Sequence, residues 1–305
     1  MRIVTVTLNA ALDVTYEVQA LVPNATHRVL RVRTRAGGKG VNVARVLRQL
    51  GRDTVVAGLA GGHTGALIRA DLAAGGLPEE LVEIGGESRR TLAVVSRRDG
   101  GATQLNEPGP QVAAAEWAEL RARLDRLLAS GAAAVVLAGS LPAGVPQGAY
   151  AELVEAAHGQ GVAAIVDADG EALHAALAAA PELVKPNAAE LRAATGQADP
   201  AGGAAALRRA GAAAVVASLG PGGLLAVTGD GSWRAVPPEV VVGNPIGAGD
   251  AAVAALAAGL VDRLPWPARL REAVAVSAAA VLHPVAGGFD PAAYRRFRDA
   301  VTITS

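Results

Sequence analysis

The residues with the clearest chemical potential lie in one segment near the C-terminus, from Gly243 to Asp250, which reads GNPIGAGD. Its small residues let the backbone turn tightly and approach a ligand closely. The segment follows a β-like run at 239–242 and opens an apolar helix expected from Ala251 to Leu260. Because the first amides of a helix lack intrahelical partners and carry partial positive charge, this position suits a phosphate group.

Asp250 has two interpretations within this segment. Asp is a favoured helix N-cap, which would give the carboxylate a purely structural role. Beside a bound phosphate, the same carboxylate can instead act as a general base. The segment alone does not separate the two, so the residues that other elements bring to it must decide.

The composition argues against several classes of function. Lys plus Arg and Asp plus Glu each number 28, so we expect neither nucleic acid nor a membrane as a partner. The longest uncharged apolar run, Ala251 to Val261, is too short to span a bilayer, and the N-terminus reads as a strand rather than a signal peptide. The chain has no cysteine, so we expect no thiolate chemistry and a cytoplasmic location. Its five histidines show no close metal-ligand spacing.

Lysine is rare in this chain. Of the 28 basic residues, 26 are Arg, and only Lys39 and Lys185 are Lys. The ammonium group of Lys carries a compact charge, whereas the guanidinium group of Arg is planar and can donate two parallel hydrogen bonds. The two residues are therefore not interchangeable at a phosphate. Each lysine sits in a Gly- or Pro-marked motif, and we interpret both as sites that require this charge, the alternative being chance surface residues.

The first elements predict a sheet with excursions from it. Arg2 to Leu8 alternates like a strand. Asp13 comes just after it and is either a turn residue or a ligand-binding residue, because α/β folds bind ligands at the carboxyl ends of their strands. Short strands then follow one another with few helices between them, which indicates a second, smaller sheet. These strands are expected at Val14 to Val18, Val29 to Arg33, Leu81 to Ile84, Thr91 to Ser96 and Thr103 to Asn106.

A glycine-rich loop at 37–40, which reads GGKG, precedes a helix expected to end before Gly51. It is not a Walker A loop, because Gly40 follows Lys39 and the first glycine position of that motif holds Arg33. The loop is either an anion site at a helix start or a tight turn with a solvated lysine.

From about residue 113 onward, strands and helices alternate. Each strand is short and apolar and ends in Gly, Pro or an acidic residue, which fits a parallel sheet with ligand loops along one edge. The expected strands are 133–137, 163–166, 182–184 and 213–217, and the expected helices are 113–128, 150–158, 269–281 and 291–301. The pattern predicts an α/β fold.

Six motifs occur in order along the chain: Thr7 to Asp13, Gly37 to Arg45, Gly139 to Pro142, Val184 to Leu191, Ser218 to Gly220 and Gly247 to Asp250. Together they resemble the ribokinase-like (PfkB) carbohydrate kinases, in the branch of 1-phosphofructokinase and tagatose-6-phosphate kinase. The resemblance implies one domain over 1–305, a three-layer αβα sandwich with a mostly parallel central sheet, and a β-sheet lid built by about 12–35 and about 80–107. It also implies phosphoryl transfer from ATP with Mg²⁺ to a phosphorylated sugar, and a homodimer formed through the lid.

On the nucleotide side, the resemblance implies that Asp250 is the catalytic base and that the amides of Gly247, Ala248 and Gly249 form an anion hole. Phosphoryl transfer depends on positioning and charge neutralisation, which such groups provide. Glu190 matches the acid that organises Mg²⁺, directly or through water. The residues matched to the nucleotide site are Lys185, Asn187, Ser218, Gly220, Gly223, Gly247 and Gly249.

On the sugar side, the resemblance implies a site closed by the lid, which excludes water and suppresses ATP hydrolysis. Arg89 matches a lid arginine that holds the phosphate already on the substrate, and Arg28 is a second candidate. The residues matched to the substrate site are Asp13, Gly38, Lys39, Asn42, Ser140, Arg89 and Arg28.

Three positions depart from the family pattern. Arg89 is followed by Arg90 in a strand that commonly reads Thr-Arg-x-Asn, so the two arginines compete for one role. Pro245-Ile246 stands where Thr followed by an apolar residue is common, which removes a hydroxyl near the nucleotide. Ala251 replaces a frequent Ser or Thr, with little expected effect.

Other functions fit parts of the sequence. A kinase for an unphosphorylated sugar or nucleoside has no use for Lys39, Arg28 and Arg89, and an inactive phosphosugar sensor has no use for an intact Asp250. The glycines at 247 and 249 imitate a dinucleotide fingerprint, but a second helix follows where that fingerprint needs a strand. Among ketose phosphates we predict fructose 1-phosphate, with fructose 6-phosphate and tagatose 6-phosphate as alternatives.

Overall fold

The chain builds its large sheet around its first strand. In the computed structural model, which describes residues 1–305, β1 (Arg2–Thr7) pairs in parallel with β4 (Thr54–Gly61) and with β8 (Ala132–Ala138). The sheet has ten strands in the order β14-β13-β12-β11-β10-β9-β8-β1-β4-β5. Its other strands are β5 (Glu79–Ile84), β9 (Ala163–Asp167), β10 (Leu183–Val184), β11 (Val215–Ser218), β12 (Leu224–Val227), β13 (Ser232–Val236) and β14 (Thr302–Thr304).

The strands from β11 to β5 pair in parallel, and a mostly parallel sheet was predicted, although without β5. β12, β13 and β14 extend the sheet in antiparallel fashion at its other end, and these three strands were not predicted. The run at 239–242, predicted as β-like, is not a strand. It has no strand to pair with, because β14 already occupies the free edge of β13, and the side chain of Val242 is 88% exposed.

Helices cover both faces of the large sheet. Neighbouring residues of a strand point to opposite faces, so Val135 packs under one helical layer and Val136 under the other. One layer contains α3 (Ala114–Ala129), α4 (Ala149–Gly159), α5 (Gly170–Leu177), α6 (Ala188–Thr195) and α7 (Pro200–Arg209). The other contains α1 (Lys39–Gln49), α2 (Gly62–Ala74), α8 (Ala248–Val261), α9 (Trp266–Val281) and α10 (Pro291–Ala300).

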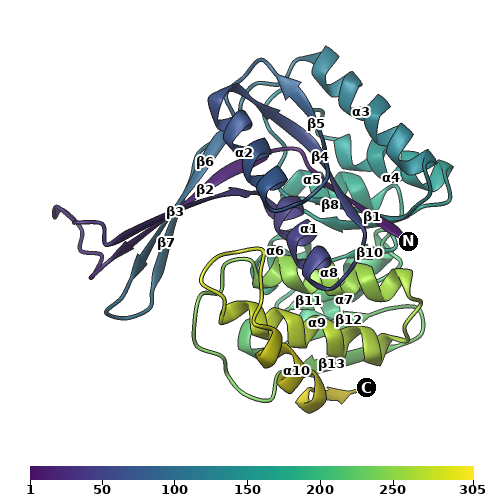
Figure 1. The fold of residues 1–305 in the computed structure, drawn as a ribbon. Coiled ribbons are helices and arrows are strands. Elements are labelled where there is room, and N and C mark those ends of the chain that lie inside the picture. The colour runs from purple at the N-terminus through teal and green to yellow at the C-terminus, as the bar shows by residue number, and fades with distance from the viewer.

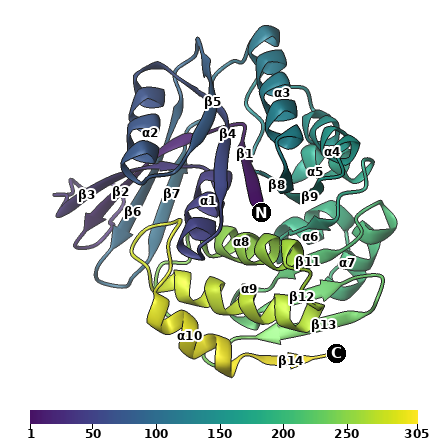
Figure 2. The same ribbon diagram turned by 45° about the vertical axis from the view of Figure 1, so that its right-hand side comes forward.

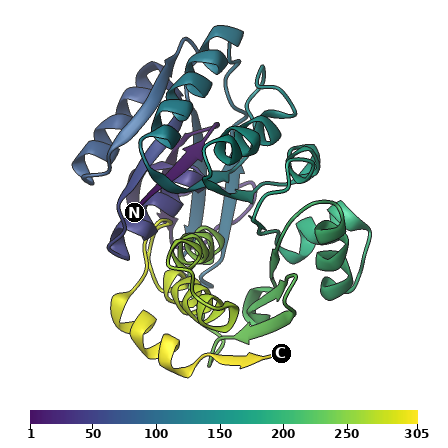
Figure 3. The same ribbon diagram turned by 90° about the vertical axis from the view of Figure 1, so that its right-hand side faces the viewer.

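This arrangement is the three-layer αβα fold that was predicted. Figure 2 shows α1, α8, α9 and α10 together on one side of the strands, and Figure 3 shows α8 to α10 stacked in yellow-green and yellow. The apolar helix α8 is buried almost along its whole length, between α1 and α9. None of the helices is both long enough and apolar enough to pass through a membrane.

The second sheet, here called the lid, has four strands in the order β3-β2-β6-β7 and projects to one side of the molecule (Figure 1). Its strands are β2 (Ala11–Val18), β3 (Arg31–Gly37), β6 (Arg89–Ser96) and β7 (Ala102–Asn106). β2 and β6 pair in parallel, although they lie about 70 residues apart in the chain.

One boundary of the lid differs from the prediction. The strand predicted at Leu81 to Ile84 belongs to β5, which pairs with β4 at the edge of the large sheet, so the second lid segment begins at Arg89 rather than near residue 80. The reason is that α2 separates β4 from β5, and a strand–helix–strand unit returns the chain to the same sheet in parallel. Period and composition identify a strand but not the sheet that it joins.

Candidate active site

The start of α8 exposes unpaired amides. Gly247 precedes the helix with φ at +85°, and a Cβ built there would lie 2.8 Å from the Cβ of Ala286, so only glycine fits. The amide of Ala248 donates to the carbonyl of Pro245 at 3.2 Å, whereas the amides of Gly249 and Asp250 have no acceptor. Of the amides predicted to form an anion hole, that of Ala248 is therefore already occupied, and that of Asp250 is available in addition.

Asp250 does not cap this helix. It is the third residue of α8, its carboxylate accepts no capping bond, and its Oδ2 instead accepts a hydrogen bond from Asn42 Nδ2 at 2.8 Å. The N-cap interpretation of Asp250 was therefore wrong. Burial raises the pKa of Asp250 to about 7, helped by the Asp167 carboxylate and opposed by Lys39, the Asn42 hydrogen bond and Lys185. A carboxylate that titrates near neutrality is suited to take a proton during a reaction.

Asp167 brings together the only two lysines of the chain. It ends β9 and is 1% exposed, and its Oδ1 lies 3.2 Å from Lys39 Nζ and 3.6 Å from Lys185 Nζ. Burial alone would lower the pKa of Lys39, but the carboxylates of Asp167, Asp250 and Glu190 outweigh it and raise that pKa. Lys185 lies beside Gly249. An acidic residue at this strand end is visible in the sequence, but its role is not, because the pairing with two distant lysines exists only in the fold.

A cavity of about 680 Å³ lies between the lid and the carboxyl ends of the strands, and we call it the sugar-side cavity. Asp13 on its wall is half-buried, and the loss of solvent around its carboxyl raises the pKa of that group to about 6 against the opposing charge of Arg89. The predicted substrate residues that line this cavity are Asp13, Gly38, Lys39, Asn42, Arg89 and Ser140. Arg28 does not: it is exposed on the loop between β2 and β3.

The structure separates Arg89 from Arg90. Arg89 lines the cavity and its Nε donates to the carbonyl of Asn9 at 3.1 Å. Arg90 points to the other face of the lid, where it forms an exposed ion pair with Glu107 at 3.1 Å. Residues of the cavity wall that the sequence analysis missed include Thr7, Asn9, Thr91, Gln104 and Asn106. Asn9 lies inside the first motif, which was the available signal, whereas the lid residues gave none.

A second cavity of about 430 Å³, the nucleotide-side cavity, opens on the other side of the start of α8. Its predicted residues are Asn187, Ser218, Gly220, Gly223 and Gly249, with Ala248 beside them. Apolar side chains that were not predicted complete it, among them Leu224, Val241, Val274, Ala278 and Val281. Polar groups at one end and an apolar slot at the other suit a phosphorylated ligand with a planar base. The cavity residues of α9 recur every three to four positions. A helix packed in the core shows the same spacing, so the sequence alone does not reveal that these residues line a cavity.

Asn187 and Glu190 form a capping box at the start of α6. Asn187 Oδ1 accepts from the amides of Ala189 and Glu190, each at 2.9 Å, and Glu190 Oε2 accepts from the amide of Asn187 at 2.7 Å. No cluster of three or more acidic, His or Cys side chains forms a metal cage. Mg²⁺ is commonly held by one or two carboxylates with waters and ligand phosphates, and the remaining oxygen of Glu190 fits that chemistry.

The two cavities meet at the first turn of α8. Gly247 and Asp250 line the sugar-side cavity, whereas Ala248 and Gly249 line the nucleotide-side cavity. A charged group transferred between ligands in the two cavities would therefore pass the unpaired amides at the start of α8. Asp250 lies at the same helical turn, and Lys39 and Lys185 lie close to it. Such a site is built for phosphoryl transfer between two bound molecules.

The comparisons with known proteins agree with this geometry. A model of pfkB family carbohydrate kinases matches residues 6–293, and the chain belongs to this family. A 1-phosphofructokinase of Rhodobacter capsulatus is 40% identical over 291 residues, covering 93% of this chain and 92% of the relative. A 1-phosphofructokinase of Xanthomonas campestris pv. campestris is 39% identical over 273 residues, covering 86% and 85%.

Among solved structures, phosphofructokinase-2 from Escherichia coli in complex with potassium superimposes with a TM-score of 0.91 at 33% identity, over 98% of each chain. The predicted family, fold class and enzyme class are thereby confirmed.

Proposed function

We propose that the protein transfers the γ-phosphoryl group of ATP to a hydroxyl of fructose 1-phosphate, giving fructose 1,6-bisphosphate. The observation that carries this proposal is the position of Asp250, a base with a pKa near neutrality where two cavities meet at unpaired amides. The names of the two curated relatives, both 1-phosphofructokinases, support the choice of substrate.

In this mechanism Asp250 takes the proton of the attacking sugar hydroxyl while the amides of Gly249 and Asp250 face the charge that develops on the transferred group. The new bond joins the sugar oxygen to the γ-phosphorus, the bond from that phosphorus to the bridging oxygen breaks, and ADP leaves. Lys39 and Lys185 add positive charge beneath the reacting atoms. Mg²⁺, held through Glu190 with waters and phosphates, would neutralise phosphate charge.

The other end of the sugar would be held away from this centre. Arg89 offers its guanidinium to the phosphate already on the substrate, and Asp13 and Asn42 face the sugar hydroxyls. Asn42 also donates to Asp250, so it orients the base as well. A reaction between nucleotide and sugar phosphates supports the expected cytoplasmic location.

We also propose that two copies pair through the lid. The outer lid face carries Val14, Tyr16, Leu92 and Leu105 around a surface hollow, and Val32 is the cross-strand neighbour of Tyr16. Val32 is 55% exposed and Leu105 is 58% exposed. Such an apolar face favours a protein contact. Because Arg28 lies outside the cavity of its own chain, a role in substrate binding would require it to reach the cavity of the partner.

The test is turnover of ATP to ADP, with magnesium, on fructose 1-phosphate, fructose 6-phosphate, tagatose 6-phosphate, fructose, ribose and adenosine. We expect the highest kcat/KM with fructose 1-phosphate. A preference for either 6-phosphate would overturn the substrate, and activity on unphosphorylated compounds alone would overturn the role of Arg89. Asp250→Ala should remove turnover while ATP still binds, as measured by calorimetry; substantial residual turnover would contradict Asp250 as the base.

A further inference from the structure

Asn9 occupies a junction on the wall of the sugar-side cavity. It lies two residues after the end of β1 and is 8% exposed. Its backbone carbonyl accepts from Arg89 Nε at 3.1 Å, and its side-chain Nδ2 donates to Ser140 Oγ at 3.1 Å. Gly109 packs so closely against this amide that a Cβ there would lie 2.3 Å from Asn9 Oδ1. Three segments of the chain therefore hold Asn9: one contacts its backbone carbonyl and two contact its side chain.

We infer that Asn9 is a positioning residue that makes Ser140 and Arg89 into a matched pair of donors for the phosphate on the sugar substrate. This inference rests on the proposed function and names how one end of the substrate is recognised. The direction of the hydrogen bonds matters here, because a site binds an anion only where it offers donors.

The contact with Asn9 uses Ser140 as an acceptor and leaves its hydroxyl proton available. A hydroxyl carries one proton and two lone pairs. The amide of Asn9 fills a lone pair of Ser140 Oγ, so the proton of this hydroxyl must find its acceptor elsewhere, and Ser140 lines the cavity. A phosphate offers only acceptors to such a donor and therefore matches it.

Arg89 is oriented by the backbone of the same residue. Its Nε donates to the Asn9 carbonyl and its Nη1 donates to the carbonyl of Glu107 at 3.4 Å. These bonds leave Nη2 without a protein acceptor, on a guanidinium that lines the cavity. Side-chain substitutions at Asn9 leave its carbonyl in place, so they test the part of the device that acts through Ser140.

Asn9→Asp is the most informative substitution, because Asp has nearly the same shape but offers only acceptors. The carboxylate would accept a hydrogen bond from the hydroxyl of Ser140, which would then no longer point to the substrate, and it would add a negative charge beside the substrate phosphate. We expect KM for fructose 1-phosphate to rise about tenfold or more, which corresponds to the loss of one hydrogen bond to a charged group. We expect KM for ATP to change less than about twofold.

Asn9→Ala and Ser140→Ala complete the design as a double-mutant cycle. If Asn9 acts through Ser140, Asn9→Ala raises KM for fructose 1-phosphate in the wild type but adds little once Ser140 is Ala. Ser130→Ala, at the exposed end of α3, is the matched control and should behave as the wild type. Thermal unfolding of each variant separates a folding defect from a change in recognition.

Three results would overturn the inference: an Asn9→Asp variant with an unchanged KM for fructose 1-phosphate, equal losses toward both substrates, or additive effects in the cycle. The wild-type rate on phosphosugars tests the proposed function separately. If the wild type turns over fructose 1-phosphate and the variants show any of these results, only the inference fails.

Discussion

At the scale of single residues, the site depends on charges held in close balance. Asp167 and Asp250 offset Lys39 and Lys185 within one cluster, in which Lys39 alone is partly exposed, and the pKa of Asp250 reflects all three neighbours. The cluster is assembled from β9, the starts of α1 and α8, and the residue that follows β10, so each charge arrives from a different part of the chain.

The raised pKa of Asp250 predicts a pH dependence. The base must be deprotonated to accept a proton, so kcat/KM should fall about tenfold per pH unit below about 7, and level off above it. Because the Asn42 hydrogen bond lowers this pKa, Asn42→Ala should move the inflection to higher pH. Ionisation of the substrate phosphate stays the same in both enzymes, so an inflection that does not move would assign it to the substrate.

The two neighbouring lid arginines predict opposite outcomes. Arg89→Ala should raise KM for fructose 1-phosphate by about ten- to a hundredfold, because a charged hydrogen bond in the cavity is lost. Arg90→Ala removes only an exposed ion pair on the other lid face and should change KM by less than about twofold. Steady-state kinetics measures both effects, at a protein concentration where each variant has the same molecular mass as the wild type. A larger rise in KM for Arg90→Ala than for Arg89→Ala would assign phosphate binding to Arg90 instead.

Residue identities were predictable where a motif carried them, and contacts were not. The GAGD segment pointed to Asp250, but its hydrogen-bond partner Asn42 lies 208 residues earlier in the chain. Likewise, the acid at the end of β9 was visible, while its contact with both lysines depends on how β9 and the loops after other strands align. Local sequence reports the type of a side chain but not what faces it.

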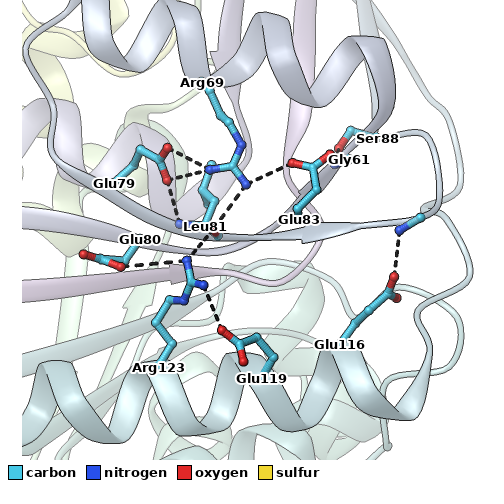
Figure 4. A network of polar contacts seen from close by, with 11 residues as sticks. Gly61, Arg69, Glu79, Glu80, Leu81, Glu83, Ser88, Glu116, Glu119 and Arg123 are labelled. Atoms are coloured by element: carbon cyan, nitrogen blue, oxygen red, sulfur yellow. Dashed lines mark hydrogen bonds and ion pairs between the residues drawn. The ribbon is translucent and has the colours of Figure 1, made fainter.

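At the scale of elements, the edge strand β5 is protected by side chains from both helical layers. Arg69 of α2 and Arg123 of α3 both donate to the backbone carbonyl of Leu81, at 3.2 Å and 2.9 Å. Figure 4 shows the two guanidinium groups converging on this strand from opposite sides, with Glu79 and Glu119 as further partners. An unpaired edge carbonyl would otherwise invite another strand.

Removing both arginines should therefore promote association. We expect Arg69→Met with Arg123→Met to lower the free energy of unfolding by about 1–2 kcal/mol, since these ion pairs are only partly buried, and to increase light scattering on warming. Arg121→Met, which breaks the ion pair between Arg121 of α3 and Glu152 of α4, is the control. Equal scattering from the two proteins would mean that β5 needs no such protection.

The elements themselves were largely predictable, and their partners less so. Alternation and glycine stops located most strands and helices within a few residues, because these signals are local. The assignment of β5 to the large sheet and the antiparallel end at β12 to β14 depend on pairing between distant segments. The run at 239–242, with three valines, looked like a strand but has no free edge to join.

At the scale of the whole molecule, the exposed apolar face of the lid leads us to expect a dimer, and a single charged substitution on that face should dissociate it. Leu105→Glu places a carboxylate on the outer lid face, where Leu105 is 58% exposed, so burial against a second copy would become costly. We expect sedimentation to give the mass of a dimer for the wild type and of a monomer for this variant. Leu67→Glu, at an exposed position on α2, should leave the mass unchanged. A monomeric wild type would refute pairing through the lid.

The meeting of the two cavities at one helical turn has a consequence for inhibitor design. A single molecule that joins adenosine to a ketose phosphate through a short anionic linker would pass Gly249 and fill both cavities together. Its second half would bind at the high effective concentration that the linker sets, so its affinity should far exceed that of either half. The best linker length would measure the path that a phosphoryl group travels in this enzyme.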